Sequence, residues 1–232
     1  MNPSILLILL LSLLSSACGS AAPPPPEEIV ARAVARMNAV AGFRFTIDRS
    51  GGPAYLDPEQ IISFSRADGA YTAPDRARAT VRVVLPGLIA EVSMVAIGER
   101  YWETNLITRT WVELPADQAF NPASLFDPQK GLQPILLADL SELAFIGLTE
   151  LEEIPGQALY QISGRLATTN LYPLSFGLIG PEPASVQLWI HPESFETYRI
   201  LITEPAASAG VEPSVWQVDF WDFGMTEAID PP

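Results

Sequence analysis

The chain has 232 residues, with 27 Asp and Glu against 13 Lys and Arg, which gives a formal net charge of −14. A strongly acidic surface repels phosphate backbones and anionic headgroups, which argues against nucleic-acid binding and against docking on anionic membranes by charge. The hydrophobic share of 48% and the mean hydropathy of +0.22 predict either a large core or an apolar cavity. The single cysteine excludes an intrachain disulfide.

Residues 1–17 have the pattern of an export signal. Ile5 to Leu14 form an apolar run broken only by Ser12, and small residues follow up to Cys18. The run is too short to span a bilayer, which takes ~20 residues. A cysteine directly after Ser-Ser-Ala gives a bacterial lipobox, in which the cysteine is diacylated with palmitate-type chains. We therefore predict a signal peptide over 1–17 and lipidation of Cys18; the alternative is a plain signal peptide with an incidental cysteine.

Residues 18–26 are predicted to be an acylated, proline-rich tether. Four consecutive prolines, Pro23 to Pro26, favour polyproline II at ~3.1 Å per residue, which makes a stiff spacer. Two acyl chains would anchor this segment stably in the cell membrane, on its extracytoplasmic face. The remaining residues, 27–232, contain no internal linker and are expected to form one domain.

Residues 29–40 are predicted to form a helix, because apolar side chains recur there at spacings of three and four. Gly42 ends this helix. The pattern then changes to alternation, with Phe43, Phe45 and Ile47 on one face, which is typical of a strand. Similar segments predict strands at 61–66, 77–85, 88–96, 100–104, 108–114, 159–166, 185–191, 197–203 and 215–223.

Three segments in the second half of the chain carry helical spacing instead: 121–126, 132–143 and 171–178. Short connections between sequential strands imply antiparallel neighbours. The fold class is therefore predicted as α+β, with one large curved antiparallel sheet, a half-barrel, and helices packed over its concave face. Such a sheet would enclose a cavity beneath its helices.

Catalytic chemistry finds little support in the sequence. The one histidine, His191, sits at a predicted strand end, and no Gly-x-Ser-x-Gly motif accompanies it. Clusters of His and Cys with metal-ligand spacing are missing, as is a phosphate-binding glycine loop. We therefore predict a protein that is not an enzyme and that needs no cofactor or metal. A hydrolase of unfamiliar type that uses His191 is kept as an alternative.

Three motifs follow the lipobox in order: Ala33-Val-Ala-Arg-Met-Asn-Ala-Val-Ala-Gly-Phe-Arg-Phe45, Gly98-Glu-Arg-Tyr-Trp102 with Trp111, and Val186-Gln-Leu-Trp-Ile-His-Pro192 followed by Tyr198-Arg-Ile200. This order resembles the LppX/LprA/LprF/LprG lipoprotein family of bacterial envelopes. The resemblance covers residues 28 to 223. It implies a half-barrel similar to the Lol lipoprotein carriers. It also implies that the protein binds acylated lipids or lipoglycans and moves them across the envelope, with a hydrophobic cavity in place of catalytic residues.

The leading hypothesis is a membrane-anchored protein that binds acylated lipid or lipoglycan and carries it, with an envelope transporter as a further candidate partner. The expected ligand-binding side chains are a helical stripe and the facing strand residues: Leu132, Ile135, Leu136, Leu140 and Leu143, opposite Val83, Leu85, Val92 and Met94. The main alternative is a non-catalytic interaction module or transporter subunit, with the same fold and a filled core. A continuous apolar void would favour the carrier.

Overall fold

The computed structural model describes residues 22–115, 120–206, 208 and 210–232. In this part of the chain, twelve strands form a single antiparallel sheet in the order β7-β6-β5-β4-β3-β1-β12-β11-β10-β9-β8, with β2 paired to β3 alone. The strands are β1 (Gly42–Ser50), β2 (Ala54–Tyr55), β3 (Ser63–Thr72), β4 (Arg76–Leu85), β5 (Leu88–Ile97), β6 (Arg100–Thr104), β7 (Trp111–Leu114), β8 (Leu140–Thr149), β9 (Leu159–Leu166), β10 (Ala184–Ile190), β11 (Thr197–Thr203) and β12 (Val215–Trp221).

The first and last long strands meet in the middle of the sheet. β1 pairs with β12 from Arg44 opposite Trp221 to Ser50 opposite Val215. From this seam the chain runs outward strand by strand to β7, and it returns inward from β8 to β12. Because β7 and β8 lie at opposite edges, the segment between them has to cross one face of the sheet. This crossing places the central helices over the sheet.

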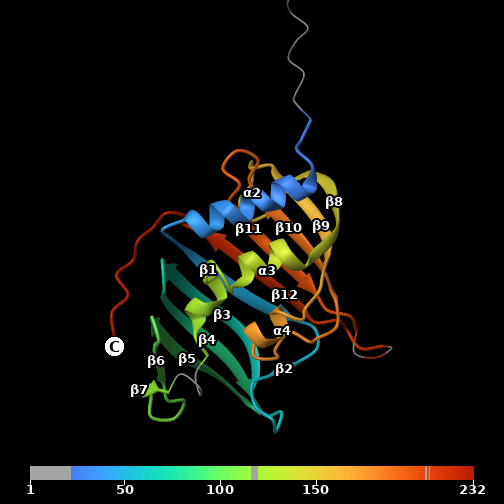
Figure 1. Ribbon diagram of the computed structural model, residues 1–232. Coiled ribbons are helices and arrows are strands. Elements are labelled where there is room, and N and C mark those ends of the chain that lie inside the picture. The colour runs from blue at the N-terminus through green and yellow to red at the C-terminus, as the bar shows by residue number, and fades with distance from the viewer. Residues whose placement is uncertain (1–21, 116–119, 207, 209) are drawn as a thin grey trace, which may run out of the picture.

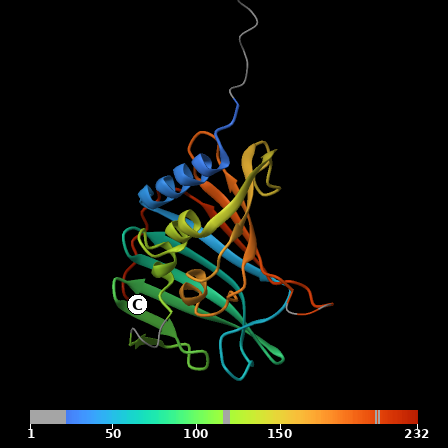
Figure 2. The same cartoon turned by 45° about the vertical axis from the view of Figure 1, so that its right-hand side comes forward.

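The helices of the described residues lie on the same, concave side of the curved sheet (Figures 1 and 2). They are α2 (Pro26–Ala39), the 3-10 helix η1 (Pro122–Phe126), α3 (Leu132–Asp139) and α4 (Leu171–Leu174). One continuous hydrophobic core joins α2, η1 and α3 to the inner face of the sheet. The predicted α+β class, with a large curved antiparallel sheet and helices over its concave face, is confirmed; the sheet is open, since its two edge strands do not pair.

Helix α2 agrees with the periodicity of the sequence. Its buried stripe comprises Ile29, Val30, Ala33, Val34 and Met37. Proline stands in its first turn, where the missing amide hydrogen costs no helical bond, and two glutamates lie at the positive end of the helix dipole. On the polar side Arg36 Nη2 lies 2.6 Å from Glu196 Oε1, which ties the helix to the loop before β11.

The helix predicted over 132–143 is wrong beyond Asp139, because Leu140–Thr149 is strand β8, paired with β9. The register of this pair shifts between Ser141 and Ala144 and again between Phe145 and Gly147. Bulges of this kind break the two-residue alternation of a strand. Leu140, Leu143 and Phe145 all pack on the core, so their spacing imitates a helix. β8 and the two-residue β2 are the strands that the sequence did not predict.

Candidate functional site

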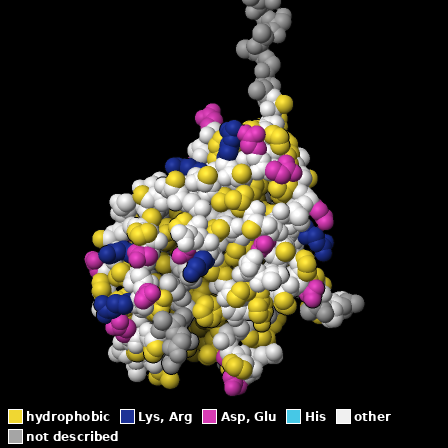
Figure 3. All heavy atoms as spheres, viewed as in Figure 1, with side chains coloured by type: hydrophobic (Ala, Val, Ile, Leu, Met, Phe, Trp, Pro, Cys, Tyr) yellow, Lys and Arg dark blue, Asp and Glu magenta, His cyan; other side chains and the backbone are white. Residues whose placement is uncertain are grey.

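An apolar cavity of about 640 Å³ lies between the concave face of the sheet and the helices η1, α3 and α4. Figure 3 shows hydrophobic side chains gathered in the lower central part of this side of the molecule. The lining side chains come mostly from β1, β3, β4, β5, η1 and the loop after α4: Phe45, Ile47, Phe64, Ala67, Ala79, Val81, Val83, Val92, Met94, Leu125, Phe126, Leu132, Leu178, Ile179, Trp216 and Val218.

The strand register brings the floor of the cavity together. Val81 lies opposite Val92, and Ala79 lies opposite Met94, so these four side chains form a patch on one face of the β4–β5 hairpin. Arg78, Thr80 and Arg82 alternate with them, so they lie on the convex face of the sheet. The sequence alternation groups these residues on one face of the hairpin, and the structure places that face toward the cavity.

Helix η1 closes one side of the cavity through a cluster of aromatic rings. The Phe126 ring centroid lies 4.7 Å from that of Phe45 and 5.0 Å from that of Phe43. Asn121 caps η1, because its Oδ1 accepts a hydrogen bond from the Ala123 backbone amide at 2.8 Å. Gly69 makes room for this packing, since a Cβ there would lie 2.5 Å from the Phe45 ring. These aromatic rings therefore form a well-packed wall on the η1 side of the cavity.

The predicted site residues divide into two groups. Val83, Val92, Met94 and Leu132 line the cavity. The other five lie outside its lining: Ile135, Leu136, Leu140, Leu143 and Leu85. Ile135 and Leu136 are buried in the core. Leu140 and Leu143 belong to strand β8 and pack on the core from there. Leu85 is the last residue of β4. An apolar stripe predicts that one side of a helix is buried, but it does not indicate which neighbour buries it. The prediction therefore placed more of α3 in the cavity than the structure does.

The mouth of the cavity is formed by residues that both line it and are exposed. These are Tyr55 and Leu56 from β2 and the following loop, Asn105 and Ile107 from the β6–β7 turn, and Phe176 after α4. Ile107 is 91% exposed and Phe176 is 63% exposed, although both are large apolar side chains. The segments that carry these residues lie at the end of the domain away from the start of α2 (Figure 1).

Among the lining residues that the structure describes, Glu103 is the one carboxylate, and the sequence pattern did not indicate it. It lies opposite Met94 on the inner face of the β5–β6 pair. Burial raises the pKa of the Glu103 carboxyl above its ordinary value of 4.5, because the apolar surroundings disfavour the charged form. The described lining is therefore mainly apolar, with an acidic, hydrogen-bonding group on its β6 side.

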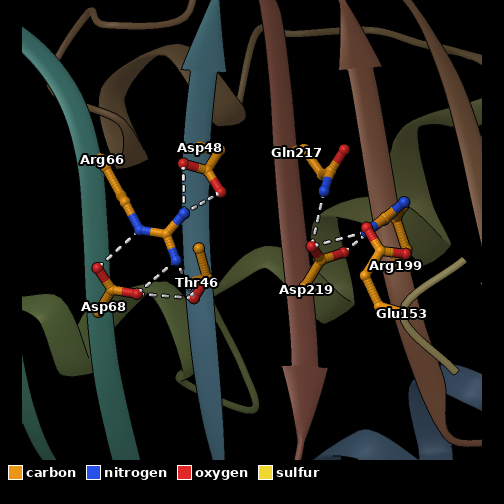
Figure 4. Close-up of polar contacts among 8 residues, drawn as sticks. All are labelled: Thr46, Asp48, Arg66, Asp68, Glu153, Arg199, Gln217 and Asp219. Carbon is orange, nitrogen blue, oxygen red and sulfur yellow. Dashed lines mark hydrogen bonds and ion pairs between the residues drawn. The ribbon is translucent and has the colours of Figure 1, made fainter.

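A second hollow, of about 510 Å³, lies on the opposite face of the sheet. Its charged side chains form two ion-pair groups (Figure 4). Arg66 lies 2.7 Å from carboxylate oxygens of both Asp48 and Asp68, and its hydrogen bond holds the pKa of Asp68 below the usual range. Arg199 lies 2.5 Å from Asp219 and 2.8 Å from Glu153. Each arginine is paired with two carboxylates, so these ion pairs hold neighbouring strands together.

No cluster of metal-ligating side chains occurs among the residues that the structure describes. His191 has a structural role in its turn, because its Nδ1 accepts backbone hydrogen bonds from Glu193 at 3.2 Å and Ser194 at 3.0 Å. Within the described ranges, no helix is both long and apolar enough to cross a membrane. Cys18, the predicted lipidation site, lies outside the described residues.

Two solved structures share this fold. LprF from Mycobacterium bovis is 14% identical with a TM-score of 0.68, and the match covers 90% of this chain and 98% of that chain. LppX from Mycobacterium tuberculosis is 12% identical with a TM-score of 0.61, over 88% and 98% of the two chains. A LolA superfamily protein from Nitrosomonas europaea reaches only 0.31, so the likeness to Lol carriers stays a prediction. No curated protein matches the sequence.

The sequence model of the LppX_LprAFG lipoprotein family matches residues 25–226, which is most of the chain. The matched segment begins just before α2 and ends just after β12, so it includes the whole sheet and every helix around the cavity. This family is one of lipoproteins rather than of enzymes, in agreement with the non-enzymatic protein that the sequence predicts. The chain therefore belongs to the LppX_LprAFG lipoprotein family, as its motifs indicated.

Proposed function

We propose that this protein is an exported, lipid-anchored carrier that binds an acylated lipid or lipoglycan in its cavity and moves it across the cell envelope. In this proposal residues 1–17 are a signal peptide, residues 18–26 are the acylated tether and residues 27–232 are the lipid-binding domain. Acyl chains on Cys18 hold the protein at the extracytoplasmic face of the membrane, and an envelope transporter is the proposed partner.

The observation that carries the proposal is the volume and lining of the cavity. Ligand pockets usually measure ~300–1,000 Å³, and the 640 Å³ found here lies within that range. Burial of one methylene group contributes ~0.8 kcal/mol, so a long acyl chain gains enough to offset the cost of being ordered. Val83, Val92, Met94 and Leu132 are the sequence-predicted residues that we retain as ligand contacts.

The alternative interaction module requires a filled core, which an open cavity of this size does not favour. A hydrolase that depends on His191 is also disfavoured, since the imidazole Nδ1 is occupied by two backbone amides of its own turn. Neither alternative explains why Val81, Val92 and Met94, on the inner faces of β4 and β5, stay only partly buried beside an open cavity. The carrier does explain it.

Native mass spectrometry of the mature lipoprotein, purified from bacterial membranes in a mild detergent, tests this function directly. We expect a population whose mass exceeds that of the acylated chain by one lipid, and we expect unfolding to release that lipid for identification. Protein that carries no lipid, and that takes up neither added acylglycerol nor added phospholipid, would contradict the carrier and favour the interaction module.

Glu103 supports a neutral headgroup for the ligand. A phosphate beside this carboxylate would bring two negative charges together in apolar surroundings, whereas an uncharged ligand meets no such repulsion. We therefore propose that acylglycerols or neutral glycolipids bind better than anionic phospholipids of the same chain length.

The same carboxyl predicts that lipid affinity depends on pH. An acyl chain beside Glu103 removes more water from it and raises its pKa further, so lipid binding is coupled to proton uptake. Affinity should be highest at low pH and should fall as pH rises past the pKa that Glu103 has in the lipid-free protein, which lies above the ordinary value of 4.5. The total fall should be about tenfold for each unit by which the lipid raises this pKa. Titrations with a fluorescent acylglycerol measure the effect.

Glu103→Gln should bind the same acylglycerol with an affinity that no longer changes with pH. The matched control is Glu99→Gln, because Glu99 is exposed at the β5–β6 turn and should leave the pH dependence as it is in the wild type. A Glu103→Gln protein that keeps the wild-type slope would show that another group takes up the proton.

A further inference from the structure

Exposed apolar side chains gather around the mouth of the cavity. Of the sixteen large hydrophobic residues that are exposed in the described part of the chain, eleven lie in four segments: 55–61, 84–89, 107–112 and 172–176. Each segment contains or adjoins a residue that lines the cavity. We name these four segments the rim. Large exposed apolar patches mark interaction sites, so the rim needs a partner.

The β4–β5 hairpin, whose turn belongs to the rim, becomes entirely apolar toward its tip. Arg82 and Glu91 form a cross-strand ion pair at 3.2 Å. Beyond that pair, residues 83–90 carry no polar side chain. Val84 and Ile89 face each other on the convex side there and are 38% and 64% exposed. A sheet with one face in water normally keeps that face polar, so this tip departs from the rest of its own strand.

A tip that is apolar on both faces fits an apolar medium that surrounds it, rather than a protein surface that covers one side. Three residue steps separate Arg82 from Leu85 at the end of β4, which at ~3.3 Å per residue is about 10 Å. Apolar surfaces that lie in a membrane interface enter it by ~5–10 Å, so the ion pair would stay at the level of the headgroups.

The composition of the rim agrees with a lipid surface. Trp111 and Tyr172 are 41% and 44% exposed, and such amphipathic rings favour the boundary between headgroups and acyl chains. The rim holds only three charged residues, Asp57, Glu59 and Arg109, in a chain whose formal net charge is −14. A nearly neutral surface of this kind suits a zwitterionic bilayer.

We propose that the rim docks the mouth of the cavity on a lipid bilayer, with the tip of the β4–β5 hairpin inserted among the headgroups. This inference rests on the proposed carrier function, and it gives the lipid a route between the cavity and the bilayer. A lipid then passes between bilayer and cavity without crossing water. The docking is independent of the acyl anchor, because it uses the other end of the domain.

A single fluorophore reports the docking. In the acylated protein Cys18 is blocked, so the thiol of Ile89→Cys accepts a polarity-sensitive label alone. The labelled full lipoprotein is mixed with phosphatidylcholine vesicles that carry a quencher on their acyl chains. We expect a blue shift and loss of emission for the label at position 89. The matched control, Glu99→Cys, lies in the turn beyond the other end of β5 and should show neither change. Water-like, unquenched emission at position 89 would overturn the proposal.

Substitution of the tip separates docking from lipid binding. Leu88→Ser/Ile89→Ser removes two residues that do not line the cavity, so the lipid found at equilibrium by native mass spectrometry should be unchanged. Uptake of lipid from vesicles should slow at least tenfold, since two large apolar side chains no longer enter the bilayer. Ile146→Ser/Leu148→Ser removes similarly exposed residues from β8 and should leave the rate unchanged.

The outcomes distinguish the two proposals. If the protein carries lipid but the tip substitution does not change its rate of lipid uptake, the docking proposal is rejected and the carrier proposal is retained. Protein that binds no lipid in any variant would reject the carrier, and the label at position 89 would still decide whether the rim enters a bilayer.

Discussion

Val81→Trp should yield a folded protein that no longer binds lipid. Val81 lies on the inner face of β4, opposite Val92, and it is only partly buried because its side chain borders the cavity. An indole at this position extends into open space rather than into packed core, so it occupies the volume that the acyl chain needs. We expect the lipid-bound peak to disappear from native mass spectra and the affinity for fluorescent acylglycerol to fall by more than tenfold.

The matched control is Thr80→Trp, which adds the same ring to the neighbouring residue on the convex face of β4. Thr80 is also only partly buried, and its side chain points away from the cavity. This variant should bind lipid as the wild type does. Circular dichroism and thermal melts check that both variants fold. Wild-type lipid binding by a folded Val81→Trp protein would show that the cavity is not the binding site.

Cys18→Ala should release the protein from the membrane. Two acyl chains on the cysteine give stable anchoring where one chain gives only marginal binding, and Ala offers no thiol for either. We expect the wild type to incorporate labelled palmitate and to stay in the membrane fraction. The Cys18→Ala chain should incorporate none, and an alkaline carbonate wash should extract it completely.

A substitution beside the cysteine serves as the control for this experiment. Ser20→Ala lies two residues further on and should leave both palmitate labelling and membrane retention unchanged. The carbonate wash matters because the rim could hold an unacylated chain loosely on vesicles. Retention of Cys18→Ala after the wash would contradict lipidation as the means of attachment.

Most of the sheet was predictable because polar and apolar side chains alternate regularly along its strands, between a solvent-exposed and a buried face. Val83, Val92 and Met94 were assigned to the cavity on that basis, and the register of β4 with β5 brings them together. For two of the five predicted residues that lie outside the cavity lining, the difference has a physical explanation. Helical spacing identifies a buried stripe without saying what buries it, and for Ile135 and Leu136 the burying surface is packed core rather than the cavity.

Glu103 was missed because the two faces of β6 are covered by different parts of the chain. On the convex face Trp102 packs against Val95 and Ile229 from the C-terminal segment. An aromatic residue therefore points outward here, while its acidic neighbour points into the cavity. Nothing in the local alternation indicates that a segment more than a hundred residues away will cover the outer face.

The seam between β1 and β12 bears on when this protein can fold. Phe45 lies opposite Phe220, so the centre of the sheet unites residues that are 175 apart in the chain. Contacts of such long sequence separation form late, because a large loop has to close before they contribute. Until its last strand is made, the chain lacks the pairing that joins its two halves. For the exported protein that we propose, this arrangement keeps the unfinished chain open enough to be threaded through a membrane.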